Sequence, residues 1–184
     1  RSTLFPYTTL FRSSYSDDLW EPTKLEKQIK FMEDNGYAFT YHDYVEIDES
    51  SKEVGIHVSG KKRVTEFDMY SCCWPGCLTV MYDAEKIGLI QINDIKKNND
   101  SAMWLRVIQK SDCYLLKETL AKYRRRSFSI TPKPIWKRIW AHYPLFRVAE
   151  EMNPVRASFW VIMNAFGNAY KKLFYVKRYK TNDA

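Results

Sequence analysis

Apolar residues recur at helical spacing in the first two thirds of the chain. In one segment Leu25, Ile29 and Met32 share a face, and Asn35-Gly36 ends the pattern. A helix that begins after Asp83 and stops at Gly88 follows the usual signals for helix ends. The sequence predicts helices over residues 21–32, 65–71, 83–88 and 100–110. The apolar face of the last is formed by Met103, Trp104, Val107 and Ile108.

Segments rich in aromatic and β-branched residues lie between these helices. The sequence predicts strands over residues 37–48, 54–58, 78–81, 113–116 and 120–124. The residues Asp48-Glu49-Ser50-Ser51 are typical of a turn, so the first two strands are expected to form a hairpin.

The pattern changes after Ser129. Asn153 and Pro154 are suited to the start of a long helix. Its apolar residues recur at helical spacing: Val155, Phe159, Ile162, Met163, Phe166, Tyr170 and Leu173. This basic segment, with Trp136 and Trp140 before it, is typical of a helix on an anionic membrane surface. It is equally compatible with a helix that packs its apolar face on its own domain, and a charge patch alone also allows nucleic-acid binding.

The charge is divided along the chain. The 184 residues carry a net charge of +7, and 45% are hydrophobic, which is ordinary for a folded chain. Residues 14–119 contain 13 Lys and Arg against 19 Asp and Glu, a net charge of −6, whereas residues 120–184 contain 14 against 3, a net charge of +11. No run of eighteen apolar residues occurs, so the sequence predicts no membrane-spanning helix. An acidic body therefore precedes a basic tail.

Residues 1–13 stand apart from the rest of the chain. They show no helical or strand period and no acidic residue, and from Thr3 to Ser13 they resemble the translation of a short-read sequencing adapter. An aromatic-rich arm is the alternative. The cysteines also carry little signal, since the spacing of Cys72, Cys73 and Cys77 matches neither a redox pair nor a zinc site. Together with Cys113 they are expected to be reduced and mostly buried.

Three polar clusters are candidates for chemistry. Adjacent carboxylates at Asp17 and Asp18 are suited to a hard divalent cation, although acidic pairs also cap helices. Asp100, at the start of a predicted helix, is suited to act as a general base, with a plain helix cap as the alternative. The guanidinium groups of Tyr123-Arg124-Arg125-Arg126-Ser127 are suited to hold phosphate oxygens, or simply to begin the basic tail.

Taken in order, these clusters resemble glycosyltransferase family 2, the bacterial inverting sugar transferases with a GT-A fold. The resemblance covers about residues 16–129. It rests on Ser16-Asp17-Asp18-Leu19-Trp20 with the helix after it, Tyr37-Ala38-Phe39-Thr40-Tyr41, Leu78-Thr79-Val80-Met81-Tyr82-Asp83, Asp100-Ser101-Ala102-Met103-Trp104-Leu105 and Leu120-Ala121-Lys122-Tyr123-Arg124.

The resemblance implies a role for each candidate residue. It implies that Asp17 and Asp18 bind Mg²⁺ or Mn²⁺, and that Asp100 deprotonates the acceptor hydroxyl. It further implies that Trp104 walls the acceptor pocket and that Arg124 and Arg125 contact the diphosphate of the donor. The expected activity is transfer of a sugar from a nucleotide-sugar donor to an acceptor hydroxyl with inversion, in the synthesis of a cell-surface polysaccharide or lipid-linked glycan.

Departures from the family pattern shape the remaining expectations. Tyr15 stands where the family usually has the first Asp of its Asp-x-Asp motif, and the N-terminal βαβ half that holds the nucleoside is missing. The resemblance implies an α/β fold, and we therefore expect an incomplete, Rossmann-like GT-A domain over residues 14–130, inactive as given, and a helical basic tail over residues 131–184. The expected location is cytoplasmic or peripheral on the inner face of the bacterial membrane, with no nucleic-acid partner. The competing hypothesis is a non-enzymatic module whose tail binds an anionic membrane or nucleic acid.

Overall fold

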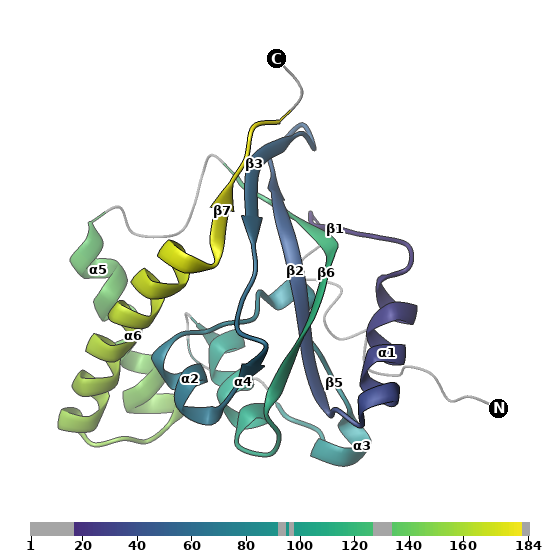
Figure 1. Ribbon diagram of the computed structural model, residues 1–184. Helices are drawn as coiled ribbons and strands as arrows, with labels where there is room; N and C mark the ends of the chain where they lie inside the picture. The colour runs from purple at the N-terminus through teal and green to yellow at the C-terminus, as the bar shows by residue number, and fades with distance from the viewer. Residues whose placement is uncertain (1–16, 92–94, 96–97, 127–133, 182–184) are drawn as a thin grey trace.

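The computed structural model describes residues 17–91, 95, 98–126 and 134–181. Residues 1–13 and Tyr15, on which predictions were made above, lie outside this range. Within it, helices surround one central sheet (Figure 1). The expected α/β class is confirmed at this level, and the arrangement is consistent with a Rossmann-like glycosyltransferase domain.

The sheet has seven strands among the described residues. They are β1 (Leu19–Trp20), β2 (Phe39–Ile47), β3 (Glu53–Val58), β4 (Arg63–Val64), β5 (Met81–Tyr82), β6 (Cys113–Arg124) and β7 (Val176–Arg178). The main order is β1-β6-β2-β3-β7, with β4 paired to β6 and β5 to β2. Only β2 and β6 pair in parallel among these strands, and Ile47 lies opposite Arg124 in their register. Both long strands therefore end at the same edge of the sheet.

The helices cover both sides of the sheet (Figure 1). They are α1 (Lys24–Asn35), α2 (Glu66–Ser71), α3 (Ala84–Ile87), α4 (Asn99–Ile108), α5 (Ile135–Trp140) and α6 (Pro154–Phe174), with a 3₁₀ turn η1 (Cys77–Thr79) and a π-helical turn η2 (Leu145–Ala149). Helix α1 lies on one side, and α2, α4 and α6 lie on the other (Figure 1). No helix within the described residues is long and apolar enough to span a membrane.

Most predicted elements are confirmed. Gly36 ends α1 in a left-handed conformation (φ 69°), and the side chain of Thr65 caps α2. The strand predicted over residues 78–81 is wrong: these residues form η1 and then the short strand β5. The reason is local, because the hydroxyl and the backbone N–H of Thr79 both donate to the carbonyl of Gly76 and close a turn there. The two strands predicted over residues 113–124 form the single strand β6.

The core lies between the sheet and the layer of α2, α4 and α6. Phe39 and Tyr41 of β2 and the apolar face of α4 are buried in it. On the α1 side Met32 is buried together with a polar group: Lys24 donates to Gln28, which donates to Thr40 and to the carbonyl of Thr79. The four cysteines all lie in described positions, and none of them forms a disulfide, as expected for reduced thiols.

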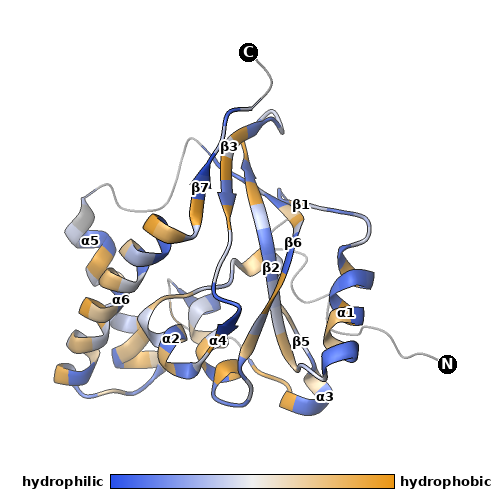
Figure 2. Ribbon diagram, in the orientation of Figure 1, coloured by the Kyte–Doolittle hydropathy of each residue, from blue (hydrophilic) through white to orange (hydrophobic). Residues whose placement is uncertain are grey.

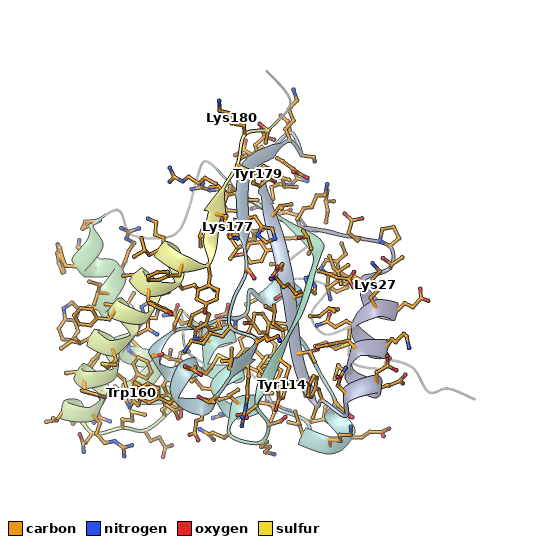
Figure 3. The ribbon with its side chains drawn as sticks, viewed as in Figure 1. Lys27, Tyr114, Trp160, Lys177, Tyr179 and Lys180 are labelled. Carbon is orange, nitrogen blue, oxygen red and sulfur yellow. The ribbon has the colours of Figure 1, made fainter. Side chains whose placement is uncertain are left out.

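Helix α6 begins as predicted, with the side chain of Asn153 accepting a hydrogen bond from the N–H of Arg156 at 2.9 Å. It packs on the domain through Ala157, Val161 and Asn164, which are buried. Figure 3 labels Trp160 on this helix, where its ring contacts those of Phe67 and Tyr70 on α2. The predicted apolar residues lie mainly on the opposite face and are exposed, so they do not cover the domain.

Candidate functional site

The predicted carboxylates Asp17 and Asp18 precede β1, whose pairing with β6 brings them to the end of that strand. The backbone N–H of Arg124 donates to Asp18 Oδ1 at 2.9 Å, and Arg126 forms an ion pair with Asp17. The parallel strands β2 and β6 end at the same edge. Ligands of α/β proteins commonly bind at the carboxyl ends of parallel strands. The Asp17–Asp18 pair is therefore in a position suited to ligand binding.

Arg124 is held by its own chain. Its guanidinium donates to the carbonyls of Asp17, Asp48 and Glu49, and to the hydroxyl of Ser51, over 2.8–3.0 Å. These contacts join the acidic segment, the β2–β3 turn and the end of β6. The observed role of Arg124 is thus a clamp between three segments, and its predicted contact with a diphosphate stays a prediction.

Arg125 is oriented differently. Its side chain is 58% exposed, and its Nε lies 3.4 Å from Oε2 of Glu46, a half-buried carboxylate. Burial raises the pKa of Glu46, and the charge of Arg125 partly opposes that shift. Because most of its guanidinium reaches solvent, Arg125 is better placed than Arg124 to receive an anionic ligand.

Asp100 lies in the first turn of α4 and is partly buried. Cys77 Sγ donates to its Oδ2 at 2.6 Å, and the backbone N–H of Ser101 donates to its Oδ1 at 2.7 Å. The N-cap residue of the helix is Asn98, which makes no side-chain cap. Both oxygens of Asp100 are therefore engaged, and the carboxylate has a defined orientation.

Tyr123 lies near the end of β6, next to Arg124. Its ring contacts that of Tyr44, with centroids 6.1 Å apart. Its pKa is raised, first by burial and then by the nearby charges of Asp18 and Glu46, with a smaller effect from Cys77. The charges of Asp18 and Cys77 both act on Tyr123, and Cys77 in turn donates to Asp100. The fold thus brings the first and second predicted clusters, 82 residues apart in sequence, toward one region.

Trp104 occupies a different environment. It is 3% exposed, belongs to the main core and packs near Phe39, with ring centroids 6.0 Å apart. The structure thus makes Trp104 a core residue, and its predicted contact with an acceptor stays a prediction.

The Asp17–Asp18 pair fits a magnesium-type cation by the chemistry of its donors. Burial is the main cause that raises the pKa of Asp18, and the hydrogen bond and charge of Arg124 oppose it without cancelling it. A carboxylate in that state gains from an added cation. Mg²⁺ is commonly held by one or two carboxylates with substrate phosphates, so two carboxylates are enough. In the part of the chain that the structure describes, no group of three or more His, Cys, Asp or Glu side chains converges as a metal site.

Sequence reasoning missed three participants in this region. Cys77 was assigned only to the core, Tyr123 was not assigned a role, and Arg126 was not separated from its neighbours. The run Tyr123-Arg124-Arg125-Arg126 was visible in the sequence. In the structure Arg124 is a clamp, Arg125 an exposed cation and Arg126 an ion-pair partner of Asp17. These separate roles depend on strand register, which the sequence does not show.

Comparison with known proteins gives several relatives. The chain is 32% identical over 158 residues to TuaG of Bacillus subtilis, a protein named as a glycosyltransferase of teichuronic acid biosynthesis; the match covers 85% of the chain and 62% of TuaG. It is 31% identical over 118 residues to WfgD of Escherichia coli, covering 63% of the chain and 46% of WfgD. It is 33% identical over 95 residues to WfaP of Escherichia coli, covering 52% of the chain and 37% of WfaP.

These relatives support a glycosyltransferase family. WfgD and WfaP are both named as UDP-Glc:α-D-GlcNAc-diphosphoundecaprenol β-1,3-glucosyltransferases. The non-enzymatic alternative is therefore not favoured. The chain spans less than two thirds of the length of each of these relatives. No protein-family profile matches the chain.

Proposed function

We propose that this chain forms part of the catalytic region of a family 2, GT-A glycosyltransferase that inverts configuration at the transferred sugar. The single observation that carries the proposal is the arrangement at one edge of the sheet, where Asp17 and Asp18 lie beside the end of β6. The similarity to TuaG, WfgD and WfaP supports the same reading. The donor is a nucleotide sugar, and the acceptor hydroxyl belongs to a cell-surface glycan or a lipid-linked saccharide.

In the proposed reaction Asp100 accepts the proton of the acceptor hydroxyl, whose oxygen then bonds to the anomeric carbon of the donor. The bond from that carbon to the diphosphate oxygen breaks, and the nucleoside diphosphate leaves with the bonding electrons. A single displacement inverts the configuration, so one base is sufficient. The hydrogen bonds from Cys77 and Ser101 fix the orientation of the Asp100 carboxylate for this role.

The leaving diphosphate carries most of the charge in this reaction. Asp17 and Asp18 are the residues that would hold Mg²⁺ or Mn²⁺, and such a cation neutralises charge on the departing nucleotide. Arg125, with its exposed guanidinium, is proposed to contact the phosphate oxygens.

The test is sugar transfer by the full-length protein that contains these residues, because the chain spans only part of its relatives. A radiolabelled UDP-glucose donor with a GlcNAc-diphosphate-lipid acceptor is the first pair, and other UDP-sugars follow as donors. We expect Asp100→Asn to lower turnover by about 10²- to 10⁴-fold while the dissociation constant for the donor is unchanged. We expect EDTA to abolish transfer and added Mg²⁺ or Mn²⁺ to restore it.

The matched control is Asp34→Asn, since Asp34 is an exposed carboxylate on α1 that pairs only with Lys30 among described residues. It should leave turnover unchanged. Full turnover in Asp100→Asn would exclude Asp100 as the base. Failure of the unaltered protein to transfer sugar from any UDP-sugar tested would overturn the proposed function.

A further inference from the structure

Helix α6 carries a continuous apolar face that the rest of the described chain leaves largely exposed, although Tyr170 near its C-terminal end contacts the rings of Trp74 and Tyr175. Successive members are three or four residues apart, so they lie on one side of the helix. We call this set the α6 stripe: Val155, Phe159, Ile162, Phe166, Tyr170 and Leu173. Each of the six is between 46% and 80% exposed. Figure 2 shows hydrophobic residues along the whole length of α6.

The exposure of the α6 stripe does not come from a loosely attached helix. The opposite face is buried, with Ala157 and Val161 at 0% and 1% exposure. Gly167 lies against the backbone of Ser71, and Lys171 Nζ donates to the carbonyls of Cys73 and Trp74. A helix that is fixed on one face and apolar on the other offers that second face to a surface outside the described residues.

Helix α5 extends this surface. It packs on α6 and carries Trp136 and Trp140, which are 60% and 49% exposed. Indole rings favour the boundary between water and lipid, since one end is apolar and the other can donate a hydrogen bond. Isolated exposed apolar residues are normal on a protein, but eight on two adjacent helices form an interaction surface.

The positive charge around this surface indicates the kind of partner that it fits. Residues 134–181 carry nine Lys and Arg against two Glu, a net charge of +7. At 100° per residue, Arg156 and Lys172 flank the α6 stripe on opposite sides. Lys177 and Lys180 lie beyond its C-terminal end and are also exposed (Figure 3). Apolar residues with aromatic neighbours and a basic border match an anionic lipid surface.

We propose that α5 and α6 form a docking surface for an anionic lipid bilayer. The α6 stripe enters the headgroup boundary, and Arg156, Lys172 and the cations after the helix contact lipid phosphates. This inference holds whether or not the chain transfers sugar. If the proposed function is also correct, the docking surface holds the site near a lipid-linked acceptor on the cytoplasmic face of the membrane.

The test is co-sedimentation of the whole chain with vesicles of phosphatidylcholine, with and without 30% phosphatidylglycerol. We expect binding to the anionic vesicles at low salt, weaker binding in 0.5 M salt and little binding to the neutral vesicles. The double variant Phe166→Ser/Leu173→Ser should lower the partition coefficient at least about tenfold. The pair Arg156→Glu/Lys172→Glu should lower it at least about 25-fold, from a factor of about five for each cation lost, with the added negative charges acting in the same direction.

Matched controls separate these effects from general ones. Leu89→Ser removes an equally exposed apolar residue away from α6, and Lys30→Glu reverses an exposed charge on α1; both should bind as the unaltered chain does. The proposal is overturned if the chain stays in the supernatant with anionic vesicles at low salt. It is also overturned if the chain self-associates without lipid and the α6 stripe variant abolishes that association, because the surface is then an interface between copies. Neither result affects the sugar-transfer assay.

Discussion

Arg124 illustrates how one residue joins segments that are distant in sequence. Its guanidinium contacts the carbonyls of Asp17, Asp48 and Glu49 and the hydroxyl of Ser51. A planar group with five donors is suited to this task, whereas an ammonium group cannot reach four acceptors in those directions. The residue therefore positions the acidic segment of the site through the backbone.

We predict that Arg124→Lys destabilises the chain by about 2–3 kcal/mol, because several carbonyls lose their donor at once. The measurement is urea unfolding, together with amide hydrogen exchange at Ser51 and Lys52 in the turn. Arg125→Lys is the control and should change stability by less than about 0.5 kcal/mol, since Arg125 is mostly exposed. Equal stability of the two variants would contradict the clamp role.

His42 is a second residue whose environment has a measurable consequence. It is 1% exposed on β2; its Nδ1 lies 2.7 Å from the carbonyl of Asp43, and its Nε2 has no hydrogen-bond partner among the described residues. Burial lowers its pKa to about 3, and the charge of Lys24 adds to that effect. The folded chain therefore holds His42 as neutral imidazole at all ordinary pH values.

This state makes stability depend on pH. In the unfolded chain His42 has an ordinary pKa near 6.5, so below that pH the unfolded state binds the extra proton and is favoured. Stability present above pH 6.5 is lost as the pH falls toward 3. Between pH 7 and pH 5 the unaltered chain should lose about 2 kcal/mol more than His42→Gln, measured by urea unfolding at both values. Identical pH dependence, or a His42 ring that titrates between pH 5 and 8 by NMR, would contradict this.

At the scale of elements, the attachment of α6 depends on a close approach to α2. A Cβ at Gly167 would overlap with the carbonyl oxygen of Ser71, lie 2.8 Å from its carbonyl carbon and lie 3.1 Å from Cys72 Cβ. The backbone of α2 cannot move aside without disturbing the core, where Cys72 is fully buried. Gly167 therefore allows two helices to pack where another residue would separate them.

We predict that Gly167→Ala destabilises the chain by about 1–3 kcal/mol through overpacking, although Ala in a helix is normally favoured over Gly by about 1 kcal/mol. The measurement is the midpoint of urea unfolding. Ala169→Gly, at an exposed position of the same helix, is the control and should show only the propensity cost of at most about 1 kcal/mol. A stabilised Gly167→Ala variant would contradict the close packing.

At the scale of the whole molecule, the proposed sugar-transfer site and the proposed docking surface lie on different parts of the fold. The acidic segment before β1 meets the end of β6 at one edge of the sheet, whereas α5 and α6 lie on the side that carries α2 and α4 (Figure 1). The carboxylates of Asp17 and Asp18 therefore lie away from the lipid phosphates that α5 and α6 would contact, which reduces the electrostatic repulsion between them. A bilayer bound at α6 would also leave the opposite side, with α1, open to solvent.

The features that the sequence predicted correctly are those that depend on residues close together in the chain. The ends of α1, α2 and α6 were predicted because Gly36, Thr65 and Asn153 act on their own neighbours. The strand predicted over residues 78–81 was not found, since its composition favours a strand while the hydrogen bonds to Gly76 close a turn. The sequence identified Asp17, Asp18 and Asp100 as candidate residues. It did not show that Arg124 donates to Asp18 or that Cys77 donates to Asp100.

The sequence by itself determined the alternation of helices and strands, the candidate residues and the amphipathic character of α6. These follow from interactions within one or two helical turns. Only the tertiary structure decided that Arg124 is a clamp, that Trp104 belongs to the core, and that α6 packs through Ala157 and Val161 and leaves the α6 stripe exposed. The physical reason is that Gly167 lets α6 approach the backbone of α2 closely, so the face that carries Gly167 is buried and the opposite face is left exposed.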